Sequence, residues 1–158
     1  MNIQPIYKVS KVNLIKFFTS HWGSPEMVIS SGTYDCSTLD GFVFFDETGN
    51  LLGVVTYILK NKECEIISLD SLQERRGIGA ALMNAVEELA KQHKCTYIKL
   101  ITTNDNLVAL KFYQKRGYKL SRLLRNAVAE ARKIKPEIPL KGNDGIPIRD
   151  ELELVKDL

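Results

Sequence analysis

The sequence contains no long apolar run and no recognisable targeting signal. Its longest apolar stretch, Leu51 to Leu59, spans nine residues and includes Gly53 and Thr56, whereas a helix that crosses a bilayer needs about 20. The first twenty residues lack a basic start followed by an apolar segment, which argues against a secretory signal. We therefore expect a cytoplasmic protein that does not associate with membranes.

Cysteines are few, and flexible linkers are missing. Cys36, Cys64 and Cys95 are odd in number, widely spaced and free of any Cys-x-x-Cys pair. That pattern argues against a disulfide framework and against a zinc site, so we predict reduced structural thiols and no bound metal. The chain has 158 residues, 44% of them hydrophobic, and no internal repeat or Gly/Ser-rich tract. This predicts a single domain over residues 1–158.

A strong net charge is also absent. The formal net charge is +3, from 22 basic and 19 acidic residues, which by itself does not indicate nucleic-acid binding. The distribution is uneven, because residues 108–141 carry a net charge of +8 and residues 142–158 a net charge of −3. The basic segment suits an anionic ligand, although a solvated helix face explains it as well. A nucleic-acid-binding module stays an alternative, but no recognisable motif supports it.

The hydrophobic pattern predicts a mixed α/β sheet. Alternating and β-branched runs separated by polar turns indicate an N-terminal antiparallel meander, and the period changes to three and four residues after Gly77, which indicates an amphipathic helix. A strand after that helix implies a parallel crossover. The expected strands cover residues 2–9, 41–46, 51–59, 63–69, 95–102, 118–120 and 150–155. The expected helices cover residues 12–22 and 78–91, a stretch from a cap at Asn104 or Asp105 to Arg116, and residues 123–133. Gly23 and Gly117 are expected to end helices, and residues 24–39 and 136–147 are expected to be loops.

A glycine-containing turn stands between the last meander strand and the amphipathic helix. It reads Arg75-Arg76-Gly77-Ile78-Gly79-Ala80. Glycines allow a ligand to approach the backbone, and the start of a helix presents free N–H groups and a positive dipole, which together favour an anion. Two arginines there oppose the dipole, at about 0.3 to 1 kcal/mol each, unless an anion is bound. The alternative is a tight turn with solvated arginines. The spacing fits neither a P-loop nor a Rossmann fingerprint.

Residues 69–118 resemble the core of the GCN5-related N-acetyltransferase (GNAT) superfamily. The segment Glu74 to Gly79 is similar to the family's pyrophosphate loop, Gln/Arg-x-x-Gly-x-Gly/Ala, although Glu74 replaces the usual Gln or Arg. The segment Asn106 to Tyr118 resembles the family signature Asn-x-x-Ala-x-x-Phe-Tyr-x-Lys-x-Gly-Phe/Tyr. The wider chain is similar to a group of bacterial GNAT proteins whose tail reads much like Gly142 to Asp150. The resemblance implies the GNAT fold, with an extended helix and loop at about residues 122–149.

The same resemblance implies an enzyme that transfers the acetyl group of acetyl-CoA directly to an amine through a tetrahedral intermediate. A non-catalytic acyl-CoA-binding regulator is the alternative. The donor would lie along one strand, on the glycine turn and beside the following helix. The implied donor contacts are Leu69, Asp70, Ser71, Arg75, Arg76, Gly77, Ile78, Gly79, Ala80, Asn106 and Tyr113.

Tyr113 and Glu65 are the implied catalytic residues. Tyr113 would give a proton to the departing thiolate, which a group with an ordinary pKa near 10 can do. From its spacing beside Phe112 alone, Tyr113 would be a core residue. Glu65 would deprotonate the ammonium, with Glu63 or a water chain as alternatives, and both acids could equally be ordinary surface residues. The acceptor, its recognition by residues 142–150, and the oligomeric state, a homodimer included, stay open.

Overall fold

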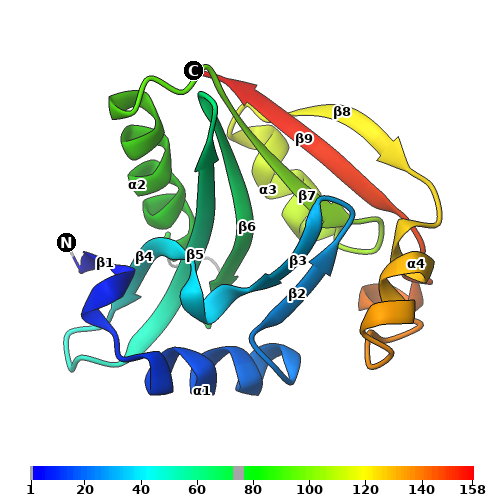
Figure 1. The fold of residues 1–158 in the computed structure, drawn as a ribbon, viewed down its shortest axis with the longest axis horizontal. Helices are drawn as coiled ribbons and strands as arrows, with labels where there is room; N and C mark the ends of the chain where they lie inside the picture. Colours follow the sequence, from blue (N-terminus) through cyan, green and yellow to red (C-terminus); the bar gives the residue numbers. More distant parts are fainter. Residues whose placement is uncertain (1, 73–76) are drawn as a thin grey trace. The chain divides into compact units, whose positions relative to one another are not determined.

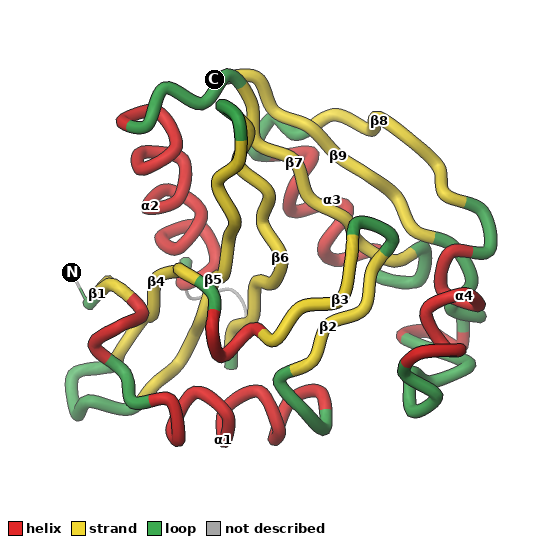
Figure 2. The backbone as a smooth tube through the Cα atoms, viewed as in Figure 1, coloured by secondary structure: helices red, strands yellow, loops and turns green. Residues whose placement is uncertain are grey.

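The computed structural model describes residues 2–72 and 77–158 (Figures 1 and 2). The chain forms two compact units, one containing residues 1–26, 35–98 and 158 and the other residues 27–34 and 99–157. Each unit combines strands with helices, and the predicted mixed α/β class is confirmed. The expectation of a single domain over residues 1–158 stays a prediction. Within the described residues, no helix is long and apolar enough to span a membrane.

The first unit contains the predicted antiparallel meander. Its strands lie side by side in the order β1, β4, β5, β6, and each neighbouring pair is antiparallel. Their bounds are β1 Ile3–Pro5, β4 Asp40–Phe45, β5 Leu51–Lys60 and β6 Glu63–Ser71. The strand expected over residues 2–9 is wrong in length. It ends at Pro5, and Ile6–Lys8 turn into a 3-10 helix, because proline supplies no N–H to continue a strand ladder.

Two helices belong to the first unit, α1 (Lys11–Trp22) and α2 (Ile78–Gln92). Gly23 ends α1 with a φ of 84°, as predicted, and its N–H bonds to the carbonyl of Thr19. α2 contacts β4, β5 and β6 through a fully buried apolar stripe (Figure 1). Gly53 of β5 permits this approach, because a Cβ there would lie 2.7 Å from Cγ2 of Ile78.

A β-bulge interrupts the pairing of β5 with β6. Thr56 faces Ser68, but Tyr57 faces Ile66, so Ile67 is an extra residue in β6. Cross-strand partners point to the same side of a sheet. The bulge therefore keeps Glu65 on the same face as Ser68, although the two are three residues apart in the sequence.

The strand that follows α2, β7 (Tyr97–Thr103), begins beside the start of β6. The Thr96 N–H donates to the carbonyl of Lys62 at 2.8 Å, and the Tyr97 hydroxyl donates to the carboxylate of Glu63. β6 and β7 therefore start at the same edge of the sheet, which is the arrangement expected of a parallel crossover. The first two residues of β7 belong to the first unit and the others to the second.

The second unit contains β7, β9 and β8 in that order, with β8 antiparallel to β9. Its further elements are α3 Leu107–Lys115, β8 Lys119–Leu124, α4 Ala127–Ile134 and β9 Glu151–Asp157. The expected helix over residues 123–133 begins too early, because Leu123 and Leu124 pair with Leu152 and Glu151 and so complete β8. The strand expected over residues 118–120 is correspondingly longer.

The predicted loop over residues 24–39 is also wrong. It contains a hairpin of β2 (Glu26–Ile29) and β3 (Gly32–Asp35), followed by a 3-10 turn at Cys36–Thr38. The Ser30 N–H at the hairpin's tip donates to the carboxylate of Glu151 at 3.0 Å. A partner 121 residues away leaves no sign in the local pattern, which is dominated by turn-forming residues.

Candidate functional site

Four polar residues of β6 share one face of the first unit's sheet. Gly53 and its partner Ser71 lie on the side of α2, so the alternate residues of β6 lie on the opposite side. With the bulge taken into account, this face carries Glu63, Glu65, Ser68 and Asp70. Three acids and a hydroxyl that are buried or partly buried on one strand face are unusual for structural residues, because buried polar groups need compensating partners.

Asp70 has the most unusual environment of the four. The Trp22 indole N–H donates to its Oδ1 at 3.0 Å. The other oxygen, Oδ2, is shielded from solvent, and no donor reaches it from the described part of the chain. Burial raises the pKa of Asp70 to about 6, against the opposing effects of the Trp22 hydrogen bond and the nearby His21. A carboxyl group with one fixed and one unsatisfied oxygen is a candidate proton acceptor.

A buried polar cluster surrounds this carboxyl group. The hydroxyls of Thr56 and Ser68 share a hydrogen bond of 2.6 Å. Cys36 is fully buried, and burial raises the pKa of its thiol to about 11, with the Thr56 and Ser68 hydroxyls acting in the opposite direction and the charge of Asp70 adding to the rise. The cluster therefore joins the 3-10 turn, β5 and β6. Its thiol stays protonated at neutral pH, so it is no nucleophile.

The other two cysteines also behave as the predicted structural thiols. Cys64 and Cys95 are free and buried, as is Cys36. Burial raises the pKa of both thiols, that of Cys64 to about 12. Among the described residues, no group of three potential ligand side chains could hold a metal ion.

The two acids named from the sequence are placed differently from ordinary surface groups. Glu65 is 8% exposed, so the alternative that it is a surface acid is wrong. Glu63 accepts the hydrogen bond from Tyr97 at the start of the strand. Their predicted common face is confirmed by the register, in which Glu63 and Glu65 pair with Lys60 and Ile58.

The glycine turn is described only from Gly77 onward, and the predicted contacts Arg75 and Arg76 lie outside the described residues, as does Glu74. Gly77 has a φ of 74° and precedes the first turn of α2, which contains Ile78, Gly79 and Ala80. Within the described residues, no side chain caps this helix and its first turn holds no acid. By contrast, Ser10 caps α1. The first N–H groups of α2 are thus available to an anion.

Asn106 and Tyr113 lie on α3 in the second unit. Asn106, and not Asn104 or Asp105, is the helix cap, because its Oδ1 accepts from the Ala109 N–H at 3.1 Å. The Tyr113 side chain is 8% exposed, and its ring packs edge-on against Phe112 at 5.4 Å and Tyr118 at 5.9 Å between centroids. Gly117 has the predicted left-handed conformation, with a φ of 93°.

The tail loop of the second unit is held by hydrogen bonds to its backbone. The Asn104 side chain donates to the carbonyl of Pro147 and accepts from the N–H groups of Arg149 and Asp150. The Arg149 guanidinium in turn donates to Asp150 at 2.9 Å. Arg132 of α4 donates to three carbonyls, those of Ile138, Pro139 and Ile148. The helix and loop before β9 therefore form an ordered structure.

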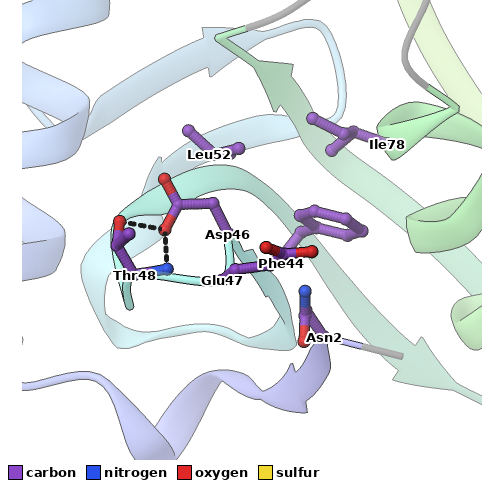
Figure 3. A pocket seen from close by; sticks show the side chains of 7 residues that line it. All are labelled: Asn2, Phe44, Asp46, Glu47, Thr48, Leu52 and Ile78. Atoms are coloured by element: carbon purple, nitrogen blue, oxygen red, sulfur yellow. Dashed lines mark hydrogen bonds between the residues drawn. The ribbon is translucent and has the colours of Figure 1, made fainter.

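A cavity of about 500 Å³ lies beside the turn that joins β4 to β5 (Figure 3). Two acids, Asp46 and Glu47, line it together with Thr48 and Ile78. Asp46 accepts hydrogen bonds from Thr48 and Asn50, which lower its pKa and organise the turn. Negative side chains repel phosphate, so this cavity does not suit the anion expected at the start of α2.

Comparison with known proteins identifies the family. The sequence profile described as the acetyltransferase (GNAT) family matches residues 12–118, which is more than half of the chain. The chain belongs to this family. It is 56% identical over 158 residues to the uncharacterized protein YxbD of Bacillus subtilis, covering 100% of this chain and 99% of YxbD. It is 53% identical over 152 residues to YdhI of the same organism, covering 96% of this chain and 95% of YdhI.

Solved GNAT structures share the fold. The "IAA acetyltransferase" of Bacillus cereus aligns with a TM-score of 0.75 at 20% identity, covering 99% of this chain and 98% of that protein. A GNAT family acetyltransferase of Elizabethkingia anophelis with acetyl-CoA bound aligns with a TM-score of 0.68 at 16% identity, covering 99% of each chain. At such identities the likeness shows the fold, and the predicted GNAT fold is confirmed.

Proposed function

We propose that the protein is an N-acetyltransferase that takes the acetyl group from acetyl-CoA and transfers it to an amine. The observation that carries this proposal is the start of α2, where a left-handed glycine precedes a helix that has no acid in its first turn and no capping side chain from residues 2–72 or 77–158. Membership of the GNAT family and fold similarity to an acetyltransferase with acetyl-CoA bound support the same donor.

The first unit supplies most of the proposed donor contacts. The N–H groups at Ile78, Gly79 and Ala80 would bind the pyrophosphate, with Arg75 and Arg76 adding positive charge. The backbone of Leu69, Asp70 and Ser71 would bind the pantetheine arm in the manner of an added strand. In the second unit, Asn106 would contact the pantetheine or adenosine part of the donor.

The chemistry proposed for the reaction is direct attack. An ammonium first loses a proton, and the neutral amine adds to the thioester carbonyl to give a tetrahedral oxyanion. Collapse of this intermediate breaks the carbon–sulfur bond, and Tyr113 protonates the departing thiolate. The acetylated nitrogen loses its second proton, which restores the Tyr113 hydroxyl through solvent. In sum, the ammonium gives up two protons, of which one ends on CoA and one in solution.

The experiment that tests this function measures CoA release from acetyl-CoA with a panel of amines, together with calorimetry of acetyl-CoA binding. Polyamines, amino acids, aryl amines and peptides with free N-termini cover the main classes of acceptor. Turnover with at least one amine is expected. Binding without turnover for the whole panel would instead support a non-catalytic acyl-CoA-binding regulator, and absence of acetyl-CoA binding would overturn the proposal.

A further inference from the structure

We propose that Asp70 is the base that takes the proton from the acceptor ammonium, directly or through one water molecule. The inference deepens the proposed acetyltransferase function and rests on it. It assigns to the Asp70 side chain a role separate from the donor contact expected of its backbone, and it assigns the base to Asp70 in preference to Glu65.

The unsatisfied oxygen is the first reason. An ionised carboxylate oxygen shielded from water is stabilised only if a donor faces it. Oδ2 of Asp70 has no such donor among the described residues, while the residue as a whole is only partly buried. A substrate ammonium, or a water molecule that it positions, supplies the missing donor and neutralises the charge. Glu65, in contrast, is buried as a residue and has interactions within the chain.

The fixed oxygen is the second reason. The indole N–H of Trp22 donates to Oδ1 at 3.0 Å, and this hydrogen bond restricts rotation of the carboxyl group. Trp22 is the last residue of α1 and is followed by the helix-ending Gly23. Trp22 is therefore a positioning residue, because it aims Oδ2 without itself meeting the reacting atoms.

The basicity of the Asp70 carboxylate suits removal of a proton from the acceptor ammonium. With a pKa of about 6, the carboxyl group is mostly ionised at neutral pH and yet holds a proton far better than an ordinary aspartate does. Among the described residues, the other titratable groups near it or on its strand face are His21 on α1, Cys36 and Asp35 at the 3-10 turn, and Glu63 and Glu65 of β6. Cys36 stays a neutral thiol, and Asp35 is bonded to the Ser37 N–H and hydroxyl.

The proposed step conserves atoms and charge. An N–H bond of the ammonium breaks, an O–H bond forms on the carboxylate, and the electron pair left on nitrogen becomes the nucleophile. After the product leaves, the carboxyl group returns the proton to solvent. The step needs no further reactant.

The test compares Asp70→Asn with Glu65→Gln as the matched control, using the amine that gives the fastest CoA release. Asp70→Asn is expected to lower kcat at least about 10²-fold at pH 7 and to keep acetyl-CoA affinity. In the unmodified protein kcat should fall below about pH 6 as Asp70 becomes protonated, and Asp70→Asn should remove this acidic limb from the profile of kcat against pH. Glu65→Gln is expected to keep that limb. Trp22→Phe is expected to shift the limb to higher pH, because loss of the hydrogen bond disfavours the ionised carboxylate.

A second measurement separates proton removal from a structural effect. The same amine is compared with a fluorinated analogue of low basicity that is already neutral at pH 7. Because such an acceptor needs no base, Asp70→Asn should slow its reaction much less than that of the parent amine. Equal slowing of both acceptors, an unchanged rate, or loss of the limb in Glu65→Gln instead would overturn the assignment while leaving the acetyltransferase function intact. No CoA release by the unmodified protein with any amine would overturn both.

Discussion

Trp22 and Asp70 are 48 residues apart in the sequence and are joined by a hydrogen bond of 3.0 Å from the indole Nε1 to the carboxylate Oδ1. The bond links the last residue of α1 to the eighth residue of β6 within the first unit. It satisfies one oxygen of a carboxyl group whose other oxygen is buried without a partner among the described residues. A buried carboxylate oxygen without a hydrogen-bond donor lowers the stability of the fold, and such groups are typical of functional sites.

The stability of Asp70→Asn should show this directly. The pKa of Asp70 is raised from 3.8 to about 6, so between these values the folded protein binds more protons than the unfolded chain does. Protonation of Asp70 therefore favours the folded state at low pH, and this contribution to the free energy of unfolding is lost as pH rises from about 4 to about 6. Asp70→Asn should be more stable than the unmodified protein at pH 7.5, by on the order of 2–3 kcal/mol, and not at pH 4.

Chemical denaturation at the two pH values measures this difference, and Asp46→Asn is the control of opposite sign. Hydrogen bonds from Asn50 and Thr48 lower the pKa of Asp46, so its contribution is present at neutral pH and lost as pH falls. Asp46→Asn should consequently weaken the fold at pH 7.5. If Asp70→Asn also weakened it there, the carboxylate would have a partner when the protein is in solution.

Gly79→Glu should abolish acetyl-CoA binding without unfolding the protein. A carboxylate in the first turn of α2 would occupy the region of the helix's first N–H groups and repel the pyrophosphate. Calorimetry with acetyl-CoA measures the loss. Gln92→Glu, which adds the same charge at the far end of the same helix, should bind normally, and retained affinity in Gly79→Glu would move the donor site elsewhere.

Local sequence signals predicted the elements whose stabilisation is itself local. α2 follows from the spacing of its apolar residues, and the left-handed glycines 23 and 117 end their helices as expected. The hairpin of β2 and β3 was missed, because the bond from Ser30 to Glu151 stabilises it from a distant part of the chain.

The candidate site was predicted only in part, for the same reason. Asp70 was named for its backbone, but the hydrogen bond to its carboxylate comes from Trp22, which no spacing rule connects to β6. The common face of Glu65 and Ser68 depends on the bulge at Ile67, and a strict two-residue period places them on opposite faces. Roles assigned to Arg75, Arg76, Asn106 and Tyr113 stay predictions.

Gly142→Ala should destabilise the tail loop. A Cβ at this position would lie 1.8 Å from Oδ2 of Asp105, which is 5% exposed and bonded to Thr103. We expect a loss of about 1–3 kcal/mol in the free energy of unfolding. In an Asp105→Ala background both close atoms of the Asp105 side chain, Oδ2 and Cγ, are removed, so the effect of Gly142→Ala should shrink in a double-mutant cycle. Equal losses in both backgrounds would contradict this close approach.

Tyr113→Phe should slow turnover at least about 10²-fold while leaving acetyl-CoA affinity nearly unchanged. The substitution keeps the ring that packs against Phe112 and Tyr118 and removes only the hydroxyl that would protonate the thiolate.

Acetyl donors with different leaving thiols distinguish proton donation by Tyr113 from a packing role. A thioester whose thiol is more acidic needs less help to depart, so the variant should lose less activity with it. Phe112→Leu serves as the control, because it alters the same aromatic group without touching the hydroxyl, and should not discriminate between the two donors. A Tyr113→Phe protein with full turnover, under conditions where chemistry limits the rate, would show that Tyr113 is a packing residue of α3.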